Sequence, residues 1–132
     1  LYKFYQFNAG LYVYTEDGKE NNSENDDPFF LVTQLPLEKF MSAKTVAGMM
    51  LAKAEEYGMT NQEVKNQSNE KLNGYDAYRA EVYGKMNGKN SLIYMCTVVK
   101  GDLAIVMQGI AKKDIEKNLE EFKKLAATVK LK

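Results

Sequence analysis

The sequence predicts an α+β fold in which one antiparallel β-sheet is flanked by helices, as a three-layer α/β/α sandwich. Residues 72–132 alternate apolar segments with tight-turn sequences and end in an amphipathic segment. Two of those segments, 92–99 and 103–110, are apolar at odd-numbered and even-numbered positions alike, which is typical of strands covered on both faces. Since one helix cannot cover two faces, the helical pattern at 42–57 is expected to cover the second.

Composition limits the classes of protein that fit. The chain has 132 residues, 45% hydrophobic and 27% charged, which is ordinary for one globular domain spanning 1–132. Its 18 basic and 18 acidic residues cancel, so nucleic acid is not an expected partner. No apolar run approaches the ~18 residues of a transmembrane segment, and none is expected.

The N-terminal part contains strand-forming residues followed by an acidic segment. Residues 1–15 are rich in aromatic and β-branched side chains, which predicts two short strands or one bent strand. Residues 16–28 hold six acids against Lys19 alone, which predicts an exposed acidic loop. Its carboxylates could serve as calcium ligands, but their spacing does not match an EF-hand loop, so a solvated charge run is the preferred interpretation.

The middle of the chain predicts a strand, a helix and a polar edge strand. The apolar run 29–35 before Pro36 favours a buried strand. Ser42 is a suitable N-cap for the helical pattern, and Gly58 a suitable stop. Residues 60–71 are polar; they could begin a helix through a capping box, but a solvent-facing edge strand is preferred.

The segment 75–86 alternates apolar and polar residues, which predicts a strand with two unlike faces. One face carries Tyr78, Ala80, Val82 and Met86. The other carries Tyr75, Arg79, Glu81, Tyr83 and Lys85. This second face has the greatest polar variety and is the candidate binding surface.

The C-terminal part completes the predicted sheet and adds the last helix. The apolar segments 92–99 and 103–110 are expected in the middle of the sheet, and Cys96 is expected to be a buried, inert thiol. The segment 114–128 has the period of an amphipathic helix. Its apolar stripe consists of Ile115, Leu119, Phe122, Ala126 and Val129.

The order of these segments resembles the PsbP-like family. The resemblance covers about residues 29–128, and its local sequence is Leu72-Asn73-Gly74-Tyr75-Asp76-Ala77-Tyr78, followed later by Lys100-Gly101-Asp102. That family includes extrinsic photosystem subunits, a Ran-binding nuclear import factor and bacterial secreted or lipoprotein domains of unknown function. The resemblance implies an antiparallel sheet between helices that binds a protein or small ligand, usually without catalysis. It carries no functional residue over to this chain.

The residues offer little support for catalysis or cofactor binding. There is no histidine, which removes histidine-dependent nucleophilic systems and the commonest transition-metal ligand. No glycine-rich phosphate loop is present, and no cofactor or metal is expected. Arg79, the one arginine, could contact a ligand's carboxylate or phosphate, but a cross-strand ion pair is the preferred interpretation.

We therefore expect a non-catalytic binding or accessory module whose partner is an unidentified protein or small ligand. The alternative is a small-molecule carrier or enzyme that uses a pocket between helix and sheet. The chain begins at Leu1 rather than methionine, so a removed leader and an extracytoplasmic location are expected, with a cytoplasmic location left open.

Overall fold

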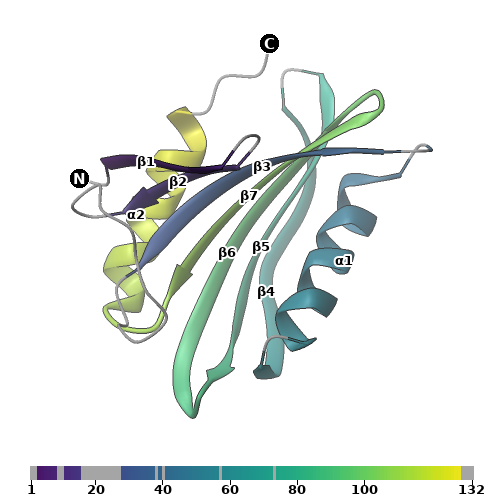
Figure 1. The fold of residues 1–132 in the computed structure, drawn as a ribbon. Helices are drawn as coiled ribbons and strands as arrows, with labels where there is room; N and C mark the ends of the chain where they lie inside the picture. The colour runs from purple at the N-terminus through teal and green to yellow at the C-terminus, as the bar shows by residue number, and fades with distance from the viewer. Residues whose placement is uncertain are drawn as a thin grey trace.

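The structure is a computed structural model that describes residues 3–8, 11–15, 28–37, 39, 41–56, 58–72 and 74–128. Its elements are β1 (Lys3–Asn8), β2 (Leu11–Thr15), β3 (Phe29–Pro36), α1 (Ala43–Glu56), β4 (Met59–Leu72), β5 (Tyr75–Met86), β6 (Lys89–Lys100), β7 (Leu103–Ala111) and α2 (Ile115–Thr128). Within these residues the strands form one antiparallel sheet of seven strands, ordered β1-β2-β3-β7-β6-β5-β4 (Figure 1). The predicted acidic loop at 16–28, and with it the calcium question, lies outside the described residues except for Pro28.

The two segments that are apolar at both parities occupy the middle of the sheet, as predicted. β6 lies between β5 and β7, and its residues from Ser91 to Val99 are all buried. Leu92, Tyr94, Cys96 and Val98 belong to one apolar cluster, and Ile93, Met95 and Val99 to another. The first cluster contains Phe122 of α2, and the second contains Val46 of α1. The two helices therefore cover opposite faces of the sheet (Figure 1).

Helix α1 is tied to the sheet at its start and past its middle by side-chain hydrogen bonds. Ser42 is the N-cap, as predicted: its Oγ accepts a hydrogen bond from the Thr45 amide at 3.1 Å. Asp76 of β5 accepts another from the Ala43 amide at 2.9 Å. Further along the helix, Gln62 of β4 donates its Nε2–H to the Leu51 carbonyl at 3.1 Å. These bonds hold α1 across β4 and β5.

Helix α2 is held by one phenylalanine and one glycine. Phe122 is fully buried and stacks on Phe30 of β3, with the ring centroids 6.1 Å apart. Its ring lies over Gly109, where a Cβ atom would overlap the ring carbons. Gly109 is paired with Phe30 on one side and Tyr94 on the other. The glycine therefore leaves the space between two aromatic residues into which α2 inserts Phe122.

The polar segment predicted as an edge strand is β4, the outermost strand beside β5. It is 14 residues long, mostly exposed, and interrupted by β-bulges between Thr60 and Glu63 and between Lys65 and Ser68. Both bulges contain the dipeptide Asn-Gln, and Asn61 and Asn66 have positive φ angles of 55° and 53°. Bulges and charged side chains hinder an edge strand from pairing with another chain.

The Phe122–Gly109 contact makes a direct stability prediction. Gly109→Ala forces a methyl group into the Phe122 ring, so we expect a loss of about 1–3 kcal/mol in the free energy of unfolding, measured by urea denaturation. Gly48→Ala is the matched control. Gly48 lies in α1, where an added Cβ atom would meet nothing within 4 Å, and alanine should raise the free energy of unfolding by about 0.5–1 kcal/mol because it favours a helix. Equal effects of both substitutions would contradict this packing.

Candidate functional site

The predicted binding residues lie on one face of β5, as their parity indicates, and this is the face on which α2 packs. Helix α2 lies mainly over β6 and β7, and β4 and β5 extend past it (Figure 1). The same face of β4 adds further charged and polar side chains. We call this combined surface the β4–β5 strip: Glu63, Lys65, Ser68 and Glu70 of β4 with Tyr75, Arg79, Glu81, Tyr83 and Lys85 of β5.

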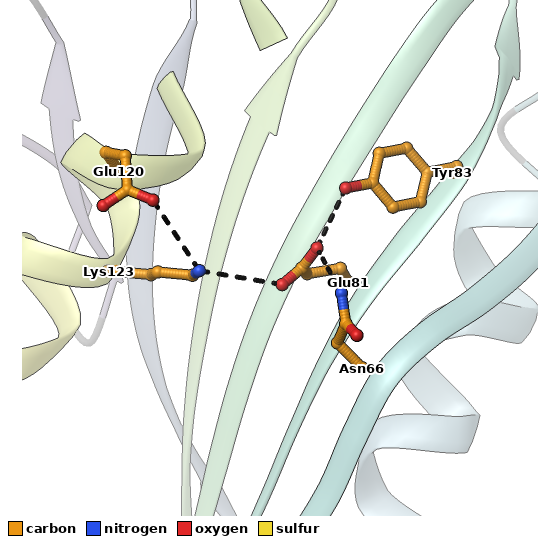
Figure 2. A network of polar contacts seen from close by, with 5 residues as sticks. All are labelled: Asn66, Glu81, Tyr83, Glu120 and Lys123. Atoms are coloured by element: carbon orange, nitrogen blue, oxygen red, sulfur yellow. Dashed lines mark hydrogen bonds and ion pairs between the residues drawn. The ribbon is translucent and has the colours of Figure 1, made fainter. Parts of the chain in front are cut away.

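Glu81 is the centre of the polar contacts on the strip (Figure 2). Its Oε1 accepts hydrogen bonds from the Tyr83 hydroxyl at 2.9 Å and from Asn66 Nδ2 at 3.1 Å. Its Oε2 lies 3.8 Å from Lys123 Nζ of α2. Alternation places Glu81 on the polar face of β5, where an exposed side chain is expected, yet the residue is buried, with 7% exposed. It is buried because neighbours from β4, β5 and α2 cover its carboxylate.

Asn66 reaches Glu81 because of the second bulge in β4. The bulge removes Asn66 and Gln67 from the strand pairing. Asn66 then bonds to Glu81 on the α2 side, and Gln67 Oε1 accepts a hydrogen bond from the Tyr78 hydroxyl at 2.8 Å. Sequence reasoning missed both residues. The repeated Asn-Gln dipeptide at 61–62 and 66–67 was the available signal, since asparagine readily adopts positive φ.

Arg79 follows the preferred prediction and forms a cross-strand ion pair. Its guanidinium contacts the Glu70 carboxylate of β4, and both side chains are 39% exposed. On the opposite strand Arg79 is paired with Cys96 of β6. The guanidinium therefore already has a carboxylate partner, as expected for a residue that joins two strands.

Lysine side chains lie over the two tyrosines of the strip. Lys65 Nζ is 5.3 Å from the centroid of the Tyr83 ring, and Lys100 Nζ is 5.4 Å from that of Tyr75. Such cation–π contacts stabilise an exposed pair by about 0.5–1 kcal/mol. Together with the bonds to Glu81, they fix several strip side chains before any partner binds.

Two tyrosines and the one cysteine on this face have raised pKa values. Burial, aided by the hydrogen bond to Glu81 and that carboxylate's charge, raises the pKa of Tyr83 to about 12. Burial likewise raises the pKa of Tyr94 to about 12 and raises the pKa of the Cys96 thiol. Cys96 is buried, as predicted. At neutral pH these groups stay protonated, which makes them poor bases and poor nucleophiles.

A pocket of about 340 Å³ lies at the end of the strip where β4, β5, β6 and the start of α2 meet. Tyr83 and Lys85 are the two predicted site residues that line it. Tyr75, Arg79 and Glu81 do not. The remaining lining residues are Asn61, Glu63, Gly84, Asn90, Ser91 and Ile115. No local sequence pattern predicts this pocket, because its walls come from four separate segments.

Comparison with known proteins shows the fold. No family model matches the chain, and no curated protein matches it. Among solved structures it is similar to a Pseudomonas aeruginosa protein of unknown function that has been proposed to be a regulator, with a TM-score of 0.69, 8% identity, and coverage of 92% of this chain and 83% of that one. It is also similar to the cyanobacterial PsbP protein CyanoP from Synechocystis, with a TM-score of 0.60, 13% identity, and coverage of 92% and 75%.

The chain therefore has a PsbP-like fold, as the sequence resemblance implies. Sequence identities of 8% and 13% support a shared fold and carry no information about a shared function. Neither helix in the described part of the chain has the length and apolar character needed to cross a membrane.

Glu81 should stabilise the fold through its buried contacts. In Glu81→Gln the charge facing Lys123 is lost, and the new amide group meets the Tyr83 and Asn66 donors, so we expect a loss of about 1–3 kcal/mol in the free energy of unfolding. Glu63→Gln is the control on the same surface, since the Glu63 side chain is 68% exposed; its effect should stay within about 0.5 kcal/mol. Urea denaturation measures both. A loss at position 81 no larger than at position 63 would show that the contacts in Figure 2 contribute nothing to stability.

Proposed function

We propose that the chain is a non-catalytic binding module, a three-layer α/β/α sandwich that contacts a partner protein through the β4–β5 strip. The observation that carries the proposal is the combination of exposure and order on this strip. Apart from the buried Glu81, its charged and aromatic side chains are partly or fully exposed at the edge of the sheet, yet Tyr83, Arg79 and Lys65 are each fixed by neighbouring groups. A surface that is already ordered loses less conformational entropy when it binds.

The charges of the strip favour a protein as the partner. Acidic Glu63 and Glu70 stand beside basic Lys65, Arg79 and Lys85. Such a surface would repel a polyanion as well as attract it, whereas a protein surface of mixed charge can place the opposite charge against each of these positions. Tyrosine and arginine are also enriched at protein interfaces.

Two observations support a role without catalysis. The 132-residue sequence contains no histidine. The raised pKa values of Tyr83, Tyr94 and Cys96 make these groups weak acids that keep their protons at neutral pH. We further propose an extracytoplasmic location, which the resemblance to secreted and lipoprotein PsbP-like domains implies.

The pocket at the end of the strip favours the alternative function, a small-molecule carrier. It lies between the start of α2 and the sheet, where the alternative requires a binding site, and it combines an aromatic ring with several polar groups.

Site-specific photo-crosslinking in the native host tests the partner surface. A photoreactive residue in place of Ser68 lies on the strip, and one in place of Lys53 lies on the exposed side of α1. We expect a discrete protein adduct from position 68 and none from position 53, and we expect Lys65→Glu to reduce the position-68 adduct severalfold. Lys44→Glu on α1 is the matched charge control and should leave the adduct unchanged. An adduct from position 53 alone, or none from either position, would contradict the proposed surface.

A further inference from the structure

The pocket at the end of the β4–β5 strip lies beside two backbone features, a β-bulge in β4 and a close approach of β4 to β5. Here the first bulge of β4 carries Asn61 at a φ of 55°. β4 lies so close to β5 that a Cβ atom on Gly84 would be 2.8 Å from both the Thr60 carbonyl oxygen and Met59 Cε. The close approach therefore requires glycine at position 84, which itself lines the pocket.

The pocket lining is rich in groups that both donate and accept hydrogen bonds. Asn61 and Asn90 carry amides. Ser91 lines the pocket without offering its hydroxyl: it is paired with Gly84, so its side chain lies on the α1 face of the sheet, where its Oγ–H donates to the Lys89 carbonyl at 3.0 Å. The apolar part of the lining is the Tyr83 ring and Ile115.

The aromatic wall is fixed in place before a ligand arrives. The Tyr83 hydroxyl is bonded to Glu81 at 2.9 Å, and Lys65 Nζ stands 5.3 Å from its ring centroid. Ile115 is the first residue of α2, and it packs against the apolar cluster that includes Phe122. Both apolar walls are thus parts of the rigid sheet-and-helix framework, which favours binding of a ligand with a flat apolar face.

We propose that this pocket binds a neutral polyhydroxylated ligand, such as one or two rings of a carbohydrate. A sugar ring presents C–H groups on its faces, which can contact Tyr83 and Ile115, and hydroxyls around its rim, which can bond to Asn61 and Asn90. The volume of about 340 Å³ is at the lower end of the range of small-molecule pockets, roughly 300–1,000 Å³.

Charged ligands fit the lining less well. Glu63 and Lys85 carry opposite charges and both line the pocket, so an anion such as phosphate meets a carboxylate beside the one lysine of the lining. For a zwitterion such as an amino acid, the ammonium partner would be Glu63. That carboxylate is 68% exposed and already lies 3.9 Å from Lys65 Nζ, where water screens its charge.

The proposal is separate from the partner surface, since the strip can contact a protein while the pocket is empty. Its test is an NMR titration of the ¹⁵N-labelled chain with glucose, galactose, maltose and cellobiose, and in parallel with glycine and inorganic phosphate. We expect saturable shifts of the amides of Gly84, Asn90 and Ser91 with at least one sugar, at a dissociation constant on the order of 1 mM. Saturation by glycine or phosphate in place of every sugar, or by no compound, would overturn the proposal.

Two variants place the binding at this site. Asn90 is exposed, so Asn90→Ala should leave the fold intact and weaken sugar binding about fivefold or more through one lost hydrogen bond. Asn69→Ala, on the exposed part of β4 away from the pocket, is the control and should bind as the wild type does. Equal losses in N90A and N69A would exclude this pocket as the site.

The two proposals fail independently. N90A leaves Ser68 and its surroundings unchanged, so the crosslinked adduct at position 68 should persist in this variant. Loss of sugar binding together with a retained adduct separates the pocket from the partner surface. Loss of the adduct in N90A would show that both depend on one site and would overturn the separate pocket.

Discussion

The constraint on which the rest of the structure depends is the burial of β6 on both faces. Nine consecutive residues, from Ser91 to Val99, are buried, and alternate residues belong to the two apolar clusters. Each fully buried large apolar side chain contributes roughly 1.5–3 kcal/mol relative to an exposed one. Each cluster includes residues of one helix. Helix α1 is tied to the sheet by Asp76 and Gln62, and α2 by Phe122 in the space above Gly109.

The polar surface follows from the sheet being wider than the helix that covers it. Helix α2 lies mainly over β6 and β7, and the face of β5 beside it contains Glu81, a carboxylate that is nearly buried without being in an apolar cluster. A buried charge destabilises the fold unless it is hydrogen-bonded and paired. Here Asn66 and Tyr83 donate hydrogen bonds to the Glu81 carboxylate, and Lys123 supplies the opposite charge. One of these groups, Tyr83, also belongs to the strip, where the bond to Glu81 holds its ring beneath Lys65. Stability and the proposed function therefore depend on shared contacts.

Much of the fold follows from local sequence patterns, and most of the site does not. Alternation along 75–86 placed Arg79, Glu81 and Tyr83 on one face, and the doubly apolar segments placed β6 and β7 at the centre. These patterns depend only on neighbours along the chain. The burial of Glu81 depends on Asn66, which a bulge brings into reach, and on Lys123 of a distant helix. The pocket likewise needs four segments, with Gly84 allowing a close approach that no local pattern reveals.

Thiol labelling tests the central claim, that each face of β6 is covered by its own helix. Cys96 is the one cysteine of the sequence and reports on the α2 side, and a Cys96→Ala/Met95→Cys variant moves the thiol to the α1 side. The structure predicts that both thiols react with a disulfide reagent no faster than the protein unfolds globally, and fully in denaturing urea. Rapid labelling of either thiol in the native protein would show that one face of β6 is open and would contradict the account.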